Sequence, residues 1–205
     1  MAAAVDAPGI AGRRIAAARL DREESIGTIM ARVDDMIDRE VDRVLALLTP
    51  DNRLAVRVCL QTGLRIGDVL ALRRSDLAKG PQFWITEAKT GKRRRVQLPH
   101  ALHAELLATC GDVWAFPSRY GDDHGHRTRQ AVWRDLKRAQ KALRLKINVG
   151  THSARKTYAV RLMAKYHDVT KVQRALGHDR PTTTMIYAMA DGLSESRRKK
   201  APPVG

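Results

Sequence analysis

Two segments near the C-terminus combine charged, imidazole and hydroxyl groups at spacings suited to chemistry on an anion. In "THSARKT", His152 and Arg155 are three residues apart, so a helix would place both on one face. The start of that helix, capped by Thr151 or the residue before it, would add backbone N–H groups that favour an anion. In "LGHDRPTTTMIY", Tyr187 follows His178 by nine residues. A helical tyrosine usually packs in a core, so this arrangement needs an explanation.

Two earlier segments each carry one basic residue of interest, Arg65 in "TGLRIGD" and Lys89 in "AKTGK". Each also has an ordinary structural explanation. Arg65 could pair with Asp68, three residues further on, and Lys89 could be a solvated turn residue. The two histidines could lie at helix ends or in the core. Taken singly, none of these residues indicates a function.

The hydrophobic periodicity predicts a mostly helical domain with one small sheet. Residues 30–50 form an amphipathic pattern that Pro50 should end, and residues 52–63 form a second helix closed by Gly63. A third helix should begin in "LRIGDVLALRRSDL". Two β-type runs, "QFWITEA" and "RRRVQLP", flank a turn containing Gly91, which predicts a β-hairpin. From Pro99 onward the pattern is helical again, and the last predicted helices are "VTKVQRALG", capped by Gly177, and "PTTTMIYAM".

The net charge of +16 is unevenly distributed along the 205 residues. Residues 1–118 contain 18 Lys/Arg and 15 Asp/Glu, whereas residues 119–205 contain 20 and 7. Such an excess predicts a polyanionic partner such as nucleic acid. A basic protein bound to a membrane surface is less favoured, because no long helix pairs this charge with a bulky apolar stripe.

Several other classes of protein are not indicated. No apolar run approaches the length of about 18 residues typical of a membrane helix, and the N-terminus lacks a secretory signal pattern. Cys59 and Cys110 lie in apolar surroundings and are expected to be buried free thiols of a cytoplasmic protein. The sequence has neither a Walker loop nor an acidic metal cluster.

Taken together and in this order, the residues resemble the active-site pattern of the tyrosine recombinase family of lambda-integrase-like enzymes. That pattern runs Arg, a hairpin Lys, His-x-x-Arg, His or Trp, and then Tyr. The segments "TGLRIGDVLALRRSDL", "KTGKRRRVQLP" and "HSARKTYAVRLM" are similar to the family's corresponding segments. All six catalytic positions are filled: Arg65, Lys89, His152, Arg155, His178 and Tyr187.

The resemblance implies a role for each of these residues. Arg65 and Arg155 would bind the scissile phosphate, with a further hydrogen bond from His178. Tyr187 would attack the phosphorus as nucleophile, with His152 as its base. Lys89 would protonate the departing 5′ oxygen, with Lys92 as an alternative, and Asp68 would orient Arg65.

The resemblance also implies an overall organisation. We expect an N-terminal arm or linker over residues 1–34, a catalytic domain over residues 35–190 and a basic tail over residues 191–205. Most family members carry a further DNA-binding domain before the catalytic one. Either this is a single-domain recombinase or such a domain has been removed. The implied partner is double-stranded DNA, bound as a homotetramer on paired recombination sites, without a membrane. The resemblance implies no cofactor and no metal, since arginines supply the positive charge.

Two alternatives to a recombinase remain open. A type IB topoisomerase would use the same chemistry to relax supercoils alone. A DNA-binding module without activity would use the basic helices only to hold phosphates, but it would have no need of Tyr187 or His178.

Overall fold

A computed structural model describes residues 38–166 and 168–177, which belong to one compact unit of the chain. Its first helices are α2 (Asp38–Leu47), α3 (Pro50–Thr62), α4 (Ile66–Leu70) and α5 (Arg74–Leu77). A hairpin of β1 (Gln82–Thr86) and β2 (Arg93–Gln97) leads to α6 (His100–Thr109). A second pair, β3 (Pro117–Ser118) and β4 (Gly121–His126), precedes α7 (Arg129–Ala142), α8 (Ser153–Tyr166) and α9 (Val169–Leu176). The expectation of a mostly helical α+β fold with a small antiparallel hairpin is confirmed, although the described residues form two two-stranded sheets where one was predicted.

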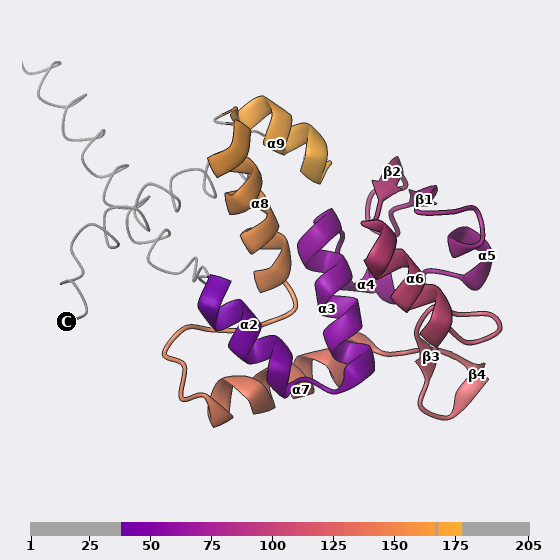
Figure 1. The fold of residues 1–205 in the computed structure, drawn as a ribbon, viewed down its shortest axis with the longest axis horizontal. Coiled ribbons are helices and arrows are strands. Elements are labelled where there is room, and N and C mark those ends of the chain that lie inside the picture. The colour runs from indigo at the N-terminus through magenta and orange to yellow at the C-terminus, as the bar shows by residue number, and fades with distance from the viewer. Residues whose placement is uncertain (1–37, 167, 178–205) are drawn as a thin grey trace, which may run out of the picture. The chain divides into compact units, whose positions relative to one another are not determined.

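Helix α3 is the central element of the described part of the chain, since it contacts α2, α4, α7 and α8 (Figure 1). Its residues Ala55, Val58 and Cys59 are almost completely buried. They belong to a hydrophobic core that also includes side chains from α2, α4, the β1–β2 hairpin, α6 and α7. A second, smaller cluster joins α8 to α9 through Ala159, Val172 and Leu176.

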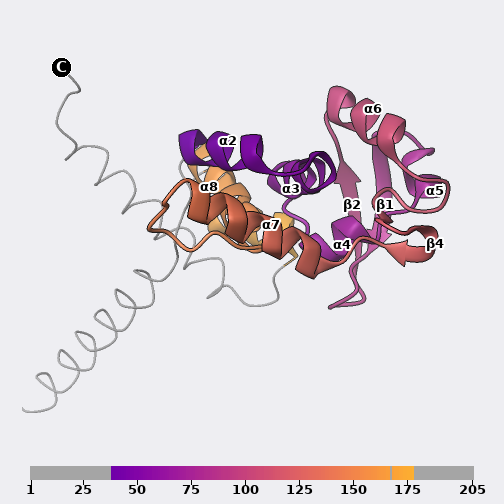
Figure 2. The same ribbon diagram turned by 90° about the horizontal axis from the view of Figure 1, so that it is seen from below.

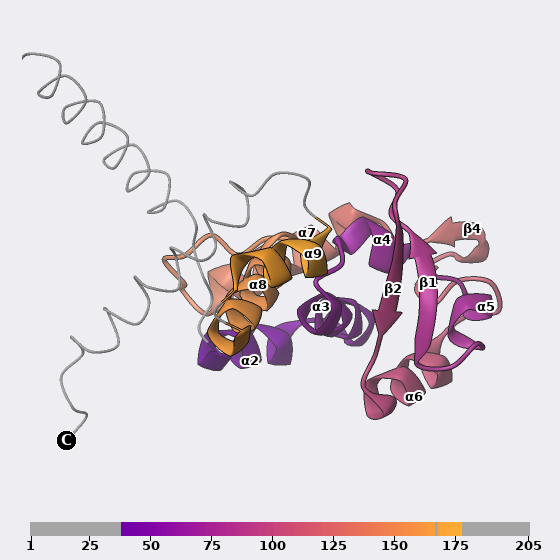
Figure 3. The same cartoon turned by 90° about the horizontal axis from the view of Figure 1, so that it is seen from above.

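The β1–β2 hairpin extends from the neighbourhood of α4 to that of α6. Its register pairs Gln82 with Gln97 and Thr86 with Arg93. Figures 2 and 3 show the turn of the hairpin beside α4 and its open end beside α6. The predicted hairpin is therefore confirmed, and Gly91 in its turn has the positive φ of 66° that glycine tolerates.

The observed helices and strands differ from the sequence prediction at three places. Pro50 does not end α2, which stops at Leu47, but begins α3 as its first residue. The predicted third helix is two short helices, because Leu72 leaves the helix and its carbonyl accepts the N–H of Ala115 at 2.8 Å. The β3–β4 pair was not predicted, since "GDDHGH" has no apolar alternation.

The two cysteines are both free thiols, as expected, but they differ in burial. Cys59 is buried, and burial raises the pKa of its thiol to about 12. Cys110 is only partly buried, contrary to the expectation, because it lies at the end of α6 rather than within a helix. As for membrane segments, no helix within residues 38–166 and 168–177 is long and apolar enough to cross a bilayer.

Candidate active site

Arg65 lies where the chain passes from α3 to α4. Gly63 ends α3 in the left-handed conformation, with φ 63°, and its N–H donates to the carbonyl of Cys59. Leu64 and Ile66 are buried on either side of Arg65 and hold the backbone there in the core. The Arg65 side chain keeps 20% of its surface exposed. The backbone of Arg65 is therefore fixed while its guanidinium remains accessible to a ligand.

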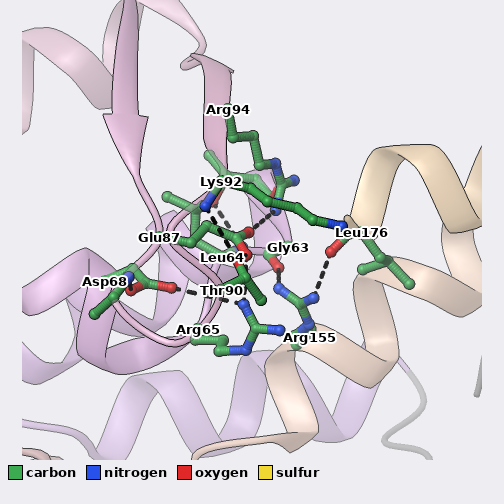
Figure 4. Close-up of polar contacts among 12 residues, drawn as sticks. Gly63, Leu64, Arg65, Asp68, Glu87, Thr90, Lys92, Arg94, Arg155 and Leu176 are labelled. Atoms are coloured by element: carbon green, nitrogen blue, oxygen red, sulfur yellow. Dashed lines mark hydrogen bonds and ion pairs between the residues drawn. The ribbon is translucent and has the colours of Figure 1, made fainter. Parts of the chain in front are cut away.

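The partner of Arg65 is Glu87, which the sequence alone did not indicate. Nη1 of Arg65 donates to Oε2 of Glu87 at 2.6 Å, whereas Oδ2 of Asp68 is 4.0 Å away (Figure 4). Glu87 directly follows strand β1, and its side chain is only 1% exposed. The one signal in the sequence was an acid two residues before the candidate lysine, which is too common in turns to be diagnostic.

Asp68 instead holds the base of the hairpin turn. Its Oδ1 accepts the backbone N–H of Ala88 at 3.0 Å. The carbonyl of Glu87 accepts the N–H groups of Thr90 and Gly91, and the N–H of Glu87 donates to the carbonyl of Lys92. These bonds fix the backbone on both sides of Lys89, which lies in the turn with an exposed side chain.

Arg155 is a buried arginine that connects three helices. It lies in the first turn of α8, and its side chain donates to the carbonyls of Gly63 and Leu176, both at 2.5 Å (Figure 4). These acceptors end α3 and α9, respectively. The guanidinium of Arg155 is therefore held in one orientation by the ends of two other helices.

His152 lies in the turn immediately before α8 and is exposed. Its carbonyl accepts the N–H of Lys156 at 3.1 Å, so the helical bonding reaches back to His152. The turn is closed by Gly150 and Ser153, which bond to each other through N–H, carbonyl and hydroxyl groups. Gly150, the residue before Thr151, thus accepts the N–H of Ser153, the first residue of α8, through its carbonyl.

The electrostatics link three of the described candidates, Arg65, His152 and Arg155. The pKa of His152 is lowered, first by partial removal of water around the ring and then by the positive charges of Arg129, Arg155, Lys156 and Arg65. The pKa of Glu87 is also lowered: burial would raise it, but this is outweighed by hydrogen bonds from Arg65 and Thr90 and by the charges of Arg65 and Arg155. Arg65, Arg155 and His152 therefore share a positive field, and Glu87 connects Arg65 to the turn that carries Lys89.

His178 and Tyr187 lie outside the described residues. The chain reaches Gly177, which caps α9 with φ 64°. A methyl group placed on Gly177 would lie 3.6 Å from Oε1 of Glu87. The residue directly before His178 is thus beside the Arg65–Glu87 pair. Among the described residues, no group of three His, Cys, Asp or Glu side chains is arranged to hold a metal ion.

The helical fold around this basic site is that of a tyrosine recombinase catalytic domain. The catalytic domain of bacteriophage HP1 integrase matches with a TM-score of 0.59 and 25% identity, covering 82% of this chain and 95% of that one. XerH site-specific recombinase, bound to palindromic difH substrate, matches with a TM-score of 0.63 and 23% identity, covering 82% of this chain and 53% of that one.

The sequence comparisons identify the family. Residues 31–192 match the model of the phage integrase family, and the chain belongs to that family. The probable integrase/recombinase YoeC of Bacillus subtilis is 30% identical over 69% of this chain and 77% of its own length. Tyrosine recombinase XerD of Rhizobium meliloti is 30% identical over 64% of this chain but only 45% of its own length. The resemblance inferred from the sequence is confirmed.

Proposed function

We propose that this chain is a site-specific recombinase that breaks and rejoins DNA strands through a 3′-phosphotyrosyl intermediate. The observation that carries the proposal is that Arg65 lies near Arg155 and His152 in one positive region, although it comes from a separate segment. Glu87 links Arg65 to a third segment, the turn that carries Lys89. A phosphodiester needs such charge most in its pentacoordinate transition state.

Each candidate residue has a defined task in this reaction. The hydroxyl of Tyr187 attacks phosphorus and gives its proton to His152, whose lowered pKa keeps the imidazole neutral and able to accept it. The guanidiniums of Arg65 and Arg155, with His178, stabilise the charge on the non-bridging oxygens. The bond from phosphorus to the 5′ oxygen breaks, and Lys89 protonates that oxygen. A 5′-hydroxyl of another strand then reverses these steps.

The wider setting is part of the same proposal. The partner is double-stranded DNA, consistent with the net charge and with the DNA-bound recombinases among the structural relatives. Rejoining between strands requires paired sites, so we infer a homotetramer that forms on DNA. We infer that the protein acts in the cytoplasm. The boundaries of the catalytic domain at residues 35–190, between an N-terminal arm and a basic tail, belong to this proposal too.

A nicked suicide substrate tests the proposal. Cleavage releases a short fragment that carries the new 5′-hydroxyl, and once this fragment diffuses away, a covalent protein–DNA adduct accumulates. We expect such an adduct with some members of a library of randomised duplexes. If no duplex yields an adduct, the chain is a binding module. If the protein also efficiently relaxes a supercoiled plasmid that lacks the selected site, the topoisomerase alternative is favoured.

A further inference from the structure

Glu87 is a buried carboxylate in the middle of a strongly basic site. Its side chain is 1% exposed, the least of any charged side chain among the residues that the structure describes. Removing a charged group from water is costly, so a buried carboxylate requires close partners. None of the family's six catalytic positions is Glu87, so its presence here needs a reason of its own.

The two carboxylate oxygens of Glu87 have different surroundings. Oε2 accepts hydrogen bonds from Nη1 of Arg65 at 2.6 Å and from the hydroxyl of Thr90 at 2.9 Å. Oε1 lies 3.5 Å from Nη1 of Arg94 and has no hydrogen bond from any residue the structure describes. The guanidinium of Arg94 is itself held, because its Nη2 donates to the carbonyl of Thr62. Glu87 thus joins the end of α3, the N-terminus of α4 and the hairpin.

We propose that Glu87 is a positioning residue that holds the guanidinium of Arg65 in the orientation that receives the scissile phosphate. This inference rests on the proposed function. By accepting from Nη1, Glu87 fixes one edge of the planar guanidinium. Because the group is rigid and planar, the directions of its remaining N–H bonds are then fixed too. An unheld arginine would have to give up side-chain freedom each time that it bound phosphate.

Glu87 rather than Asp68 performs this task. Oδ2 of Asp68 is 4.0 Å from Arg65, beyond hydrogen-bond distance, and Oδ1 is engaged with the N–H of Ala88. The side chain of Glu87 contacts the turn that carries Lys89 through the hydroxyl of Thr90, and the carbonyl of a glutamine can accept that hydrogen bond too. That turn is closed by backbone bonds of Glu87 to Lys92, Thr90 and Gly91, which a side-chain substitution preserves.

The test is the substitution Glu87→Gln in the full chain. Glutamine keeps the length of the side chain and one carbonyl acceptor, but it loses the negative charge that orients Arg65. We expect single-turnover cleavage of the selected suicide duplex to slow by roughly 10²-fold, as for a small misplacement of a reacting group, with DNA affinity changed by less than about threefold. Glu105→Gln is the matched control, since Glu105 pairs with Arg57 at 2.6 Å on the exposed surface and should retain the parent rate.

Two further readouts separate positioning of Arg65 from other roles. A double variant with Arg65→Lys should be no slower than Arg65→Lys alone, because both changes remove the same interaction. Replacing the 5′-bridging oxygen of the DNA by sulfur should not rescue Glu87→Gln, because Arg65 acts on the phosphate and not on the leaving group. Additive losses, rescue by sulfur or an unchanged cleavage rate would each overturn the inference.

A measurement without DNA keeps the inference separate from the proposed function. Nitrogen NMR of the arginine side chains should show slow rotation of the Arg65 guanidinium in the parent protein and fast rotation in Glu87→Gln. If Arg65 rotates equally fast in both proteins, Glu87 does not hold it, whatever the activity. If rotation behaves as expected but the parent forms no adduct with any duplex, then the proposed function fails.

Discussion

At the scale of single residues, Lys89 combines a fixed backbone with an exposed side chain. The backbone bonds of Glu87 and the contact of Ala88 with Asp68 hold the turn on α4. No hydrogen bond or ion pair of the Lys89 ammonium group is seen with the residues in the described ranges. A lysine in this position can meet a leaving oxygen without first breaking an internal ion pair.

We predict that Lys89→Ala will cleave normal DNA roughly 10²–10⁴-fold more slowly than the parent, because general-acid catalysis is worth about that much. With sulfur in place of the 5′-bridging oxygen, the variant should cleave almost as fast as the parent, since a thiolate departs without a proton. Single-turnover rates on the two substrates check this. Equal losses on both would indicate a phosphate contact, and rescue of Lys92→Ala alone would move the role to Lys92.

The pH dependence of cleavage tests the role of His152. A base must be neutral, so the rate should rise with pH through the pKa of His152 and level off above it. Because that pKa is lowered from the ordinary 6.5, the rise should occur below the usual histidine range. Among the positive charges near His152, Arg129 lowers this pKa most. Arg129→Gln removes that charge, so the rise should move to higher pH.

Arg134→Gln is the control for this measurement, since it removes one exposed positive charge from the same helix without being among the charges that lower the pKa of His152. Its profile should match that of the parent. If the acid limb has the same midpoint in all three proteins, His152 is not the group whose titration limits cleavage.

At this scale the sequence identified the candidate residues but not the way they are held. Arg65, Lys89, His152 and Arg155 were predicted from their order and spacing, and the structure brings the charges of Arg65 and Arg155 near His152. The partner of Arg65 was predicted as Asp68 from helical spacing, but Glu87 is closer. A contact between residues 22 positions apart depends on where the hairpin packs against α4, and local periodicity contains no information on that.

At the scale of elements, the end of α3 is where packing and active site meet. Gly63 has a positive φ, its carbonyl accepts from Arg155, and a methyl group on its Cα would lie 2.3 Å from the Tyr158 ring. Both the backbone conformation and the close approach of α8 therefore require glycine here. The sequence predicted Gly63 as the end of a helix, but not its contact with α8.

We predict that Gly63→Ala will lower the free energy of unfolding by about 3 kcal/mol, because about 1 kcal/mol of left-handed backbone strain adds to overpacking against Tyr158. Gly91→Ala is the matched control, with φ 66° but open space around it, and should cost only about 1 kcal/mol. Urea denaturation checks both values. Equal losses in the two variants would show that the α3–α8 contact is looser than the structure indicates.

The elements that could be predicted are those that local sequence signals determine. Helices α3 and α9 and the β1–β2 hairpin have a clear period and terminal signals such as Gly63, Gly91 and Gly177, and they were predicted with small errors at their ends. The division between α4 and α5 was not, because it depends on the bond from Ala115 to the carbonyl of Leu72. Tertiary hydrogen bonds of this kind override local helix preference.

At the scale of the whole molecule, the positive charge is the dominant feature. Among the described residues, one concave surface of about 630 Å³ includes Arg119, Arg127, Arg134 and Arg138 in its lining. Another of about 440 Å³ includes Arg93, Arg94, Arg95 and Arg174. Several of these arginines also form internal contacts, so only part of this charge is available to DNA.

We predict that DNA affinity will fall with salt concentration, with a slope of log K against log salt near −0.9 per phosphate neutralised. If six or more phosphates are contacted, affinity should drop by about 10³-fold or more between 50 and 200 mM salt. Fluorescence anisotropy with a labelled duplex measures this slope. A flat salt response would contradict an electrostatic mode of binding.

The central claim is that Tyr187 carries the broken DNA strand, and locating the covalent bond tests it most directly. The chain has four tyrosines, of which Tyr120 and Tyr166 are exposed and Tyr158 packs against Gly63. After trapping the adduct and digesting the protein, mass spectrometry should find the nucleotide on the peptide that contains Tyr187, joined through a 3′ phosphate. Tyr187→Phe should bind DNA and give no adduct. A nucleotide on another residue, or an adduct that persists in Tyr187→Phe, would contradict this account.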